Sequence, residues 1–239
     1  MDVQIKLIAL TMSHAQLHVL LPKDSGGLPS SQVTSGDPDK VACTIATELS
    51  GLSEGVQRHG FLSPAETNTD SLTLIYTQLL TEERLQGEPA ERINRVSVTE
   101  AGETLSPAHN RIVIDVVKDL KNDLDQVMQS RLNKRGLIHL LGLLPDIFDH
   151  KELAAAYYAL TGEKPSSPLM LARMMLDRYT MGSGDRQREV KGRGLIEEYE
   201  SEAPDLLGEK WEKNKDLYRT GGPKAKRLYK KRNTFSNYI

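Results

Sequence analysis

The sequence predicts an α/β domain followed by a mainly α-helical domain, and three observations support this fold class. Within residues 1–105, strand-like apolar segments precede and follow a single capped helix. A long amphipathic helix then occupies residues 106–131. Residues 134–179 contain three short helical segments with clear start and stop signals. We therefore divide the chain into an α/β domain at residues 1–105, a linking helix at 106–131, and a helical domain with a basic tail at 132–239.

The α/β domain begins with two apolar segments, residues 3–10 and 16–21, which favour β-strands. Residues 13–15 lie between them, so the two segments are predicted to form a hairpin. The following residues, 23–35, are rich in Gly, Ser and Pro and are predicted to form a loop. Further strands are predicted at residues 56–61, 71–80 and 96–99.

One helix is predicted inside this domain, at residues 38–50. Asp37 suits the cap at its start, because the side chain of an aspartate accepts hydrogen bonds from the first backbone N–H groups. Pro38 suits the first helical position, and Gly51 falls where a left-handed residue ends a helix. The apolar face is predicted to consist of Val41, Ile45 and Leu49.

The segment around this helix, residues 26–52 (GGLPSSQVTSGDPDKVACTIATELSGL), resembles the Nudix box. The leucine–proline turn at residues 28–29 and the glycine–leucine stop at 51–52 match the two ends of that motif. Ala42, Glu48 and the spacing between them also match. The resemblance implies a Nudix-like sandwich fold for the α/β domain.

In the Nudix family, glutamates on this helix hold Mg²⁺, which neutralises a pyrophosphate and activates water. Here the arginine and the first glutamate of the family pattern align with Thr44 and Ile45, and the paired glutamates align with Glu48 and Leu49. A single carboxylate gives poor support for a metal cluster, and Glu48 equally suits a solvated helix surface. We therefore expect no catalytic residue, no metal and no cofactor in this domain.

The linking helix is predicted to begin at Ser106 and Pro107, a cap followed by a proline at the first helical position. Its apolar residues recur every three or four positions, with charged residues opposite. This stripe suits packing on the helix's own domain and also suits a dimer seam, and both interpretations stay open. The stripe consists of Ile112, Val113, Val116, Val117, Leu120, Leu124, Val127 and Met128.

The helical domain begins with three short helices. Pro145 ends the first of them. Asp149 and Glu152 form the capping-box pattern at the start of the second helix, and Gly162 follows its end. A serine–proline pair at 167–168 starts the third helix. Two short helices joined by a tight turn are typical of a helix-turn-helix, although a plain helical bundle would give the same pattern.

The third helix begins with an apolar segment at residues 168–171, and Arg173 and Arg178 are its only basic residues. Helices that read base edges commonly present Arg, Lys, Asn or Gln. The start of this helix is therefore poorly equipped for base readout. It could pack inward and leave phosphate contacts to the neighbouring segments.

Two basic segments follow the third helix. Residues 181–193 are interrupted by glycines and suit either a DNA-binding wing or a solvated loop. Residues 209–232 place Trp211, Tyr218 and Tyr229 among many cations, which suits nucleic-acid binding or a tail that its aromatic residues anchor. The candidate DNA-contacting residues are Arg173, Arg178, Arg186, Arg188, Lys191, Arg193, Lys224, Lys226, Arg227 and Lys230.

The order of these features resembles the Nudix-related transcriptional regulators, in which a winged helix-turn-helix follows a degenerate Nudix-like domain. Residues 221–229 (GGPKAKRLY) resemble the end of the wing in these regulators, so residues near 197–219 would be an insertion in the wing. The resemblance implies double-stranded DNA as a partner and an ADP-ribose-like or nucleotide-sugar effector. It depends further on His109, Leu143, Leu144, Pro145, Phe148, Leu153, Tyr157 and Gly162.

Charge and composition agree with this division. The net charge is −2, yet residues 1–105 contain 7 Lys or Arg and 14 Asp or Glu, whereas residues 106–239 contain 24 and 19. The basic second part is where a polyanion is expected to bind. Cys43 is the only cysteine, which excludes an internal disulfide and favours a reducing, cytoplasmic location. We expect no membrane segment and no signal peptide.

Two functions from different classes account for these features. The first is a dimeric DNA-binding transcriptional regulator whose non-catalytic Nudix-like domain senses a nucleotide or sugar-phosphate type effector. The alternative is a divergent Nudix hydrolase that acts on a nucleoside diphosphate derivative. A weaker third function is a structural protein whose helical domain contacts another protein.

Overall fold

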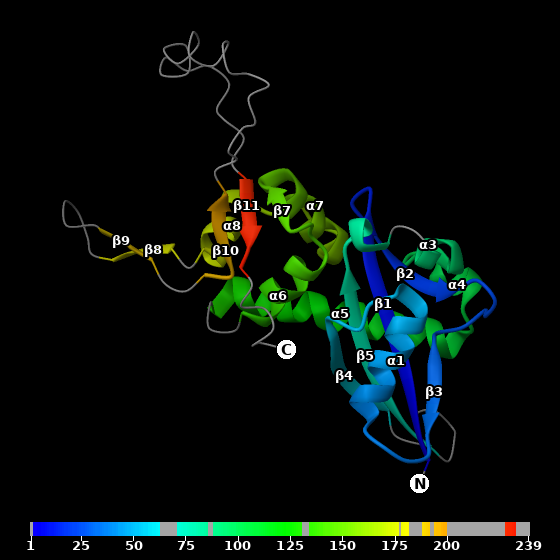
Figure 1. Cartoon of the computed structure of the whole chain (residues 1–239). Coiled ribbons are helices and arrows are strands. Elements are labelled where there is room, and N and C mark those ends of the chain that lie inside the picture. Colours follow the sequence, from blue (N-terminus) through cyan, green and yellow to red (C-terminus); the bar gives the residue numbers. More distant parts are fainter. Residues whose placement is uncertain are drawn as a thin grey trace.

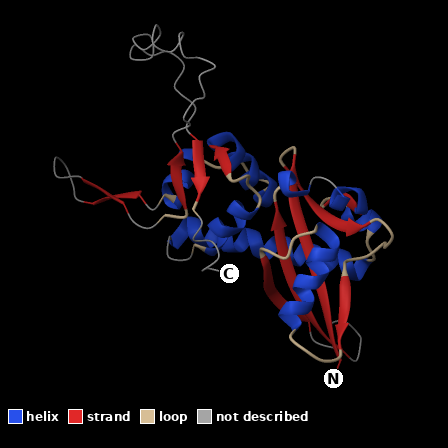
Figure 2. Cartoon of the chain, in the orientation of Figure 1, coloured by secondary structure: helices blue, strands red, loops and turns tan. Residues whose placement is uncertain are grey.

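The computed structural model describes residues 2–62, 71–85, 88–130, 134–176, 178–181, 188–191, 194–199 and 228–232. Two bodies of secondary structure lie side by side, a sheet-containing front half up to residue 105 and a helix-rich rear half from residue 134 (Figures 1 and 2). The long helix α5 (Pro107–Ser130) contacts elements of both halves. The predicted fold class, strands around one helix and then a mainly helical part, is present.

The front half is built on a six-stranded mixed sheet with the order β4-β5-β1-β2-β6. The strand β1 is long enough to pair with two strands on one side, β3 through its first residues and β2 through its last. Its other side pairs with β5 in parallel. The strands are β1 (Asp2–Ser13), β2 (Gln16–Pro22), β3 (Ser30–Val33), β4 (Val56–Leu62), β5 (Ser71–Leu80) and β6 (Ile93–Ser97).

A two-residue loop joins β1 to β2. Ser13 pairs with Gln16, and the φ angles of His14 and Ala15 are 51° and 59°. Positive φ at both central residues is the geometry that a type I′ hairpin loop requires. The predicted hairpin is therefore confirmed, although neither loop residue is the glycine that this geometry favours.

Helix α1 (Pro38–Ser50) covers one face of the sheet. Asp37 caps the helix through Asp39 N at 3.0 Å, and Gly51 ends it with φ of 75°. The three residues predicted for the apolar face contact one hydrophobic cluster together with alternate residues of β1. That cluster includes Ile5, Leu7, Ala9, Ala42, Ile45, Leu49 and Tyr76, with Val41 packed against it.

Helix α5 covers the opposite face, where Ile8, Leu10 and Ile75 point. Successive side chains of a strand point to opposite faces, so one strand supplies both clusters. Six of the eight predicted stripe residues of α5 are buried, and Val117 and Met128 pack against the same cluster. The short elements η1 (Glu82–Leu85), α3 (Glu88–Arg92) and α4 (Ala101–Thr104) complete the front half.

The rear half contains three helices, α6 (Arg135–Gly142), α7 (His150–Thr161) and α8 (Pro168–Met175). A three-stranded sheet with the order β10-β11-β7 lies beside them (Figure 1), built from β7 (Ile147–Asp149), β10 (Ile196–Tyr199) and β11 (Leu228–Lys231). A separate antiparallel pair, β8 (Arg178–Met181) and β9 (Arg188–Lys191), follows α8.

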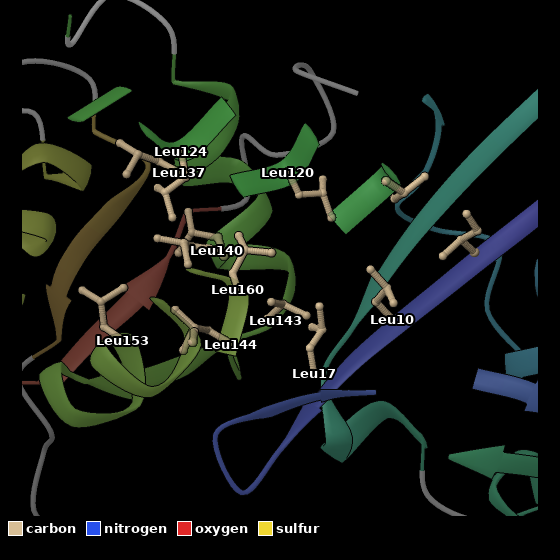
Figure 3. Close-up of a cluster of buried hydrophobic side chains, with 14 of the residues drawn as sticks. Leu10, Leu17, Leu120, Leu124, Leu137, Leu140, Leu143, Leu144, Leu153 and Leu160 are labelled. Atoms are coloured by element: carbon tan, nitrogen blue, oxygen red, sulfur yellow. The ribbon is translucent and has the colours of Figure 1, made fainter. Parts of the chain in front are cut away.

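One hydrophobic cluster joins the two halves (Figure 3). It runs from Leu10 and Leu17 on the front sheet through Leu120 on α5 to Leu140 on α6 and Leu153 on α7. Burial of apolar surface stabilises the folded state by about 25 cal/mol per Å². Because this cluster is continuous, separating the halves would expose apolar side chains of both.

Three expectations about secondary structure are wrong in part. Residues 30–33, expected in a loop, form β3, because pairing with β1 outweighs their Ser-rich composition. The first rear helix ends at Gly142, three residues before the proline that was expected to end it, and residues 147–149 form β7, where no strand was predicted. The strand predicted at residues 96–99 lies three residues earlier, as β6 at Ile93–Ser97, and the rest of 81–105 contains three short helical elements.

Candidate functional site

The helix pair α7–α8 has the start and stop signals that the sequence predicts. The Asp149 carboxylate accepts from the backbone N–H groups of Lys151 and Glu152, both at 2.8 Å, and the Glu152 carboxylate accepts from Asp149 N at 2.7 Å. Gly162 ends α7 with φ of 74°. The Ser167 hydroxyl then caps α8 by accepting from the Met170 N–H at 3.2 Å. These local bonds determine where both helices begin.

Helix α8 has one buried face and one exposed face. Leu171, Ala172 and Met175 are fully buried against the rear core. Leu169 is 41% exposed, and Arg173, one helical turn later, is also exposed. The expectation that the apolar start of this helix packs inward is therefore wrong for Leu169, because the inward positions belong to other residues.

The three-stranded sheet is joined directly to the end of α8. Leu195 N donates to Met175 O at 2.6 Å, and Arg232 N donates to Leu195 O at 3.2 Å. A Cβ on Gly194 would lie 2.5 Å from the carbonyl carbon of Leu176, so only glycine fits at this junction. The sheet is thus held close to the third helix by main-chain contacts.

Tyr229 anchors the sheet to the rear core. Its ring centroid lies 5.9 Å from that of Phe148, and both residues are buried. A buried ring cannot stack on a base, so the expected role of Tyr229 in nucleic-acid stacking is wrong and the anchoring alternative is correct. Trp211 and Tyr218 lie outside the described residues.

The candidate DNA-contacting residues are distributed over the rear half. Arg173 lies on the exposed face of α8, and Lys230 is exposed on β11. Arg178 lies on β8, and Arg188 and Lys191 lie on β9, which pairs antiparallel with β8. The residues that fall outside the described part of the chain are Arg186, Arg193, Lys224, Lys226 and Arg227.

The predicted insertion lies between two paired strands. Strand β10 pairs antiparallel with β11, from Ile196↔Lys231 to Tyr199↔Leu228, and residues 200–227 connect them outside the described part. The expected start of the insertion at residue 197 is too early, because residues 197–199 belong to β10.

The Nudix-box helix presents few metal ligands. Ile45 and Leu49 are nearly fully buried against the sheet, and Glu48 is exposed. Across the described residues, no group of three or more His, Cys, Asp or Glu side chains is placed to hold a metal ion. Cys43 is a free, half-buried thiol on the same helix.

A lysine–histidine contact lies on the other face of the front sheet. Lys6 Nζ is 2.8 Å from His109 Nε2, and a Cβ on Gly27 would lie 3.1 Å from the same ring. Burial lowers the pKa of Lys6, and burial together with the Lys6 charge lowers the pKa of His109. This pair was not predicted, and its one signal in the sequence is a lone charge within the apolar residues 3–10.

A polar cluster also ties the start of α1 to the sheet. Arg58 Nη2 donates to Asp39 Oδ1 at 2.8 Å, Arg58 Nε donates to the Tyr76 hydroxyl at 3.2 Å, and that hydroxyl donates to Asp39. The Tyr76 and Arg58 hydrogen bonds lower the pKa of Asp39. The three side chains hydrogen-bond to one another, and this favours a structural role for the cluster.

The junction between the halves holds a second polar cluster. His59 on β4 lies 3.2 Å from Asp119 on α5, and His139 on α6 lies 3.1 Å from Asp123, one turn further along α5. Lys231 on β11 donates to Leu144 O. Helix α5 therefore carries polar as well as apolar contacts between front and rear.

The fold of this chain is similar to the folds of several solved structures. No protein-family model and no curated protein match the chain. Among solved structures, NrtR of Shewanella oneidensis complexed with a 27mer DNA is similar with a TM-score of 0.62 and 14% identity, over 98% of this chain and 95% of that chain. A MutT/nudix family protein from Enterococcus faecalis is similar with a TM-score of 0.52 and 16% identity, over 80% of this chain and 85% of that chain. This is a Nudix-like fold.

The similarity extends beyond the Nudix-like front half. A second structure of Shewanella oneidensis NrtR is similar with a TM-score of 0.59 and 14% identity, over 80% of this chain and 94% of that chain. The resemblance to Nudix-related regulators is thus confirmed at the level of the fold. No helix among the described residues is long and apolar enough to cross a membrane.

Proposed function

We propose that this protein is a DNA-binding transcriptional regulator whose rear half is a winged helix-turn-helix. The observation that supports this most is the likeness over 98% of the chain to NrtR, a protein whose structure was solved with a 27mer DNA. In this interpretation α7 and α8 are the helix-turn-helix, α8 is the recognition helix, and the wing runs from the β8–β9 pair to β10 and β11. Residues 132–239 then act as the DNA-binding domain.

Charge supports the same assignment. Residues 164–193, which span α8 and the β8–β9 hairpin, contain 7 Lys or Arg and 3 Asp or Glu. Phosphate contacts from such residues position a protein on a duplex without reading its sequence. The ten candidate residues identified from the sequence are proposed as this set of contacts.

The Nudix-like front half is proposed as a sensor rather than a hydrolase. Buried Ile45 and Leu49 occupy positions where the family places carboxylates, and a lone exposed Glu48 cannot neutralise a pyrophosphate through a metal. The family resemblance suggests an ADP-ribose-like or nucleotide-sugar effector. Contacts along α5 offer a physical route from front to rear, and effector binding would shift the balance between two arrangements of a homodimer.

Titration of duplex DNA with the full chain tests the DNA-binding part. Affinity is expected to fall steeply with salt, by a factor of about 10³ or more between 50 and 200 mM if six or more phosphates are contacted. Arg173→Ala should weaken binding, whereas Arg111→Ala, which removes an arginine that is 85% exposed on α5, should not. A DNA affinity that does not change with salt concentration would contradict the proposal. Equal affinities of Arg173→Ala and Arg111→Ala would contradict it as well.

The sensor part is tested by adding ADP-ribose or nucleotide sugars to the same titration, with Mg²⁺-dependent hydrolysis measured in parallel. A change in DNA affinity without turnover is expected. Turnover that disappears in Glu48→Gln would instead favour the alternative function, a divergent Nudix hydrolase acting on a nucleoside diphosphate derivative.

A further inference from the structure

The exposed face of α8 has an unusual chemical character for a helix that contacts DNA. The helix sequence, PLMLARMM, contains no Asn, Gln, Asp or Glu, and Arg173 is its one side chain able to hydrogen-bond a base edge. Leu169 is nevertheless 41% exposed, one turn before Arg173. A single exposed leucine is ordinary on a protein surface, so the argument depends on where Leu169 lies in the helix and on the charge around it.

The position of Leu169 within the helix decides what it can reach. It is the second residue of α8, directly after the Ser167 cap and Pro168. In a helix-turn-helix, the residues at the start of the recognition helix are those that contact base edges in the major groove. The flanking charge, 7 cations against 3 anions over residues 164–193, matches a polyanionic duplex rather than an apolar protein surface.

The major groove offers one apolar group, the C5-methyl of thymine. We propose that Leu169 reads a thymine methyl group, so that this protein selects its site partly by apolar contact. The inference deepens the proposed function and depends on it. Leu169 and Arg173 are separated by about 6 Å of helix rise, close to two base-pair steps of about 3.4 Å, so both can reach one short sequence.

The test begins with selection of bound fragments from a randomised duplex pool, using the full chain at fixed salt. Each thymine of the selected site is then replaced singly by deoxyuridine, which removes the methyl group and keeps the Watson–Crick pairing. At one or more positions the affinity should fall by about threefold to fivefold, as burial of one methyl-sized group predicts.

The Leu169→Ala variant should bind the thymine and deoxyuridine duplexes equally at that position. Alanine favours a helix more than leucine does, so the variant is expected to fold. Ile114→Ala on α5 is the matched control, since Ile114 is a similarly exposed aliphatic residue, 49% exposed, on another helix. It should keep the difference between thymine and deoxyuridine.

The outcomes separate the two proposals. If no specific duplex is selected, the proposed function fails. If a duplex is selected but every deoxyuridine substitution is tolerated, the reading by Leu169 is overturned while the DNA-binding function stands. A methyl effect that persists in Leu169→Ala would overturn it equally, because another residue would then make the contact.

Discussion

His139 Nε2 lies 3.1 Å from Asp123 Oδ2, and this contact joins α6 to α5 at the junction between the halves. Arg135 Nε reaches the same carboxylate oxygen at 3.2 Å. Burial lowers the pKa of His139, against the opposing effect of Asp123, and Arg135 and His59 lower it further. The ring therefore resists protonation in the folded state.

Because folded His139 resists protonation, the protein should become less stable at acidic pH. An unfolded histidine titrates near 6.5, so below about that pH the unfolded chain binds a proton that folded His139 resists. The free energy of unfolding should then fall as the pH decreases from 7 to 5. Urea titrations at several pH values measure this slope.

His139→Gln should reduce the slope, because it removes the buried ring whose pKa is lowered. His109 contributes in the same direction, since its pKa is also lowered, so part of the slope should persist. An equal slope in wild type and His139→Gln would contradict the assignment.

The crossing of α5 and α6 depends on Gly136. A Cβ at this position would lie 2.4 Å from Leu124 Cα, a backbone atom that cannot move aside cheaply. Gly136→Ala should therefore destabilise the protein by about 1–3 kcal/mol or more. Thermal unfolding would measure the loss, and Gly26→Ala, which meets no atom within 4 Å, should change stability by less than about 0.5 kcal/mol.

Lys231 predicts a rise in stability at alkaline pH. Burial lowers its pKa to about 8, while nearby Asp146 acts in the opposite direction. Between pH 8 and the value of about 10.4 for an unfolded lysine, only the unfolded chain keeps the proton. The free energy of unfolding should thus increase from pH 8 to 10, by on the order of 1–2 kcal/mol.

Above about pH 10 this gain should reverse. Burial raises the pKa of Tyr76 and of Tyr157, so the unfolded chain loses their protons first and becomes relatively more stable. Lys231→Met should reduce the rise between pH 8 and 10, leaving a smaller part from Lys6, whose pKa burial also lowers, and should keep the decline above it. Denaturant titrations that show the same rise in this variant would exclude Lys231 as its source.

A substitution in the hairpin loop between β1 and β2 should increase the stability of the protein. Ala15 has φ of 59°, a left-handed conformation that costs a residue with a Cβ roughly 1 kcal/mol. Ala15→Gly should relieve this and raise stability by up to about 1 kcal/mol. Ala108→Gly on α5, where the backbone is helical, should lower stability by about 0.5–1 kcal/mol in the same thermal measurement.

The longer helices α1, α5, α7 and α8, and the residues at which they begin, could be predicted from the amino-acid sequence. Asp37, Pro38 and Gly51 enclose α1, and Asp149 and Gly162 enclose α7, as predicted. A cap satisfies backbone groups within about four residues of itself, so the information is local and readable. The long stripe of α5 was predictable for the same reason, because its period is that of the helix.

The other features depend on contacts between segments that are distant in sequence. Strand β3 forms because β1 offers it hydrogen bonds, and the contacts Lys6–His109 and Asp123–His139 join elements that are distant in sequence. The exposure of Leu169, on which the reading of thymine depends, likewise follows from which side of α8 packs against the rear core. Pairing and burial depend on partners that the local sequence does not specify, whereas caps and helical periodicity do not.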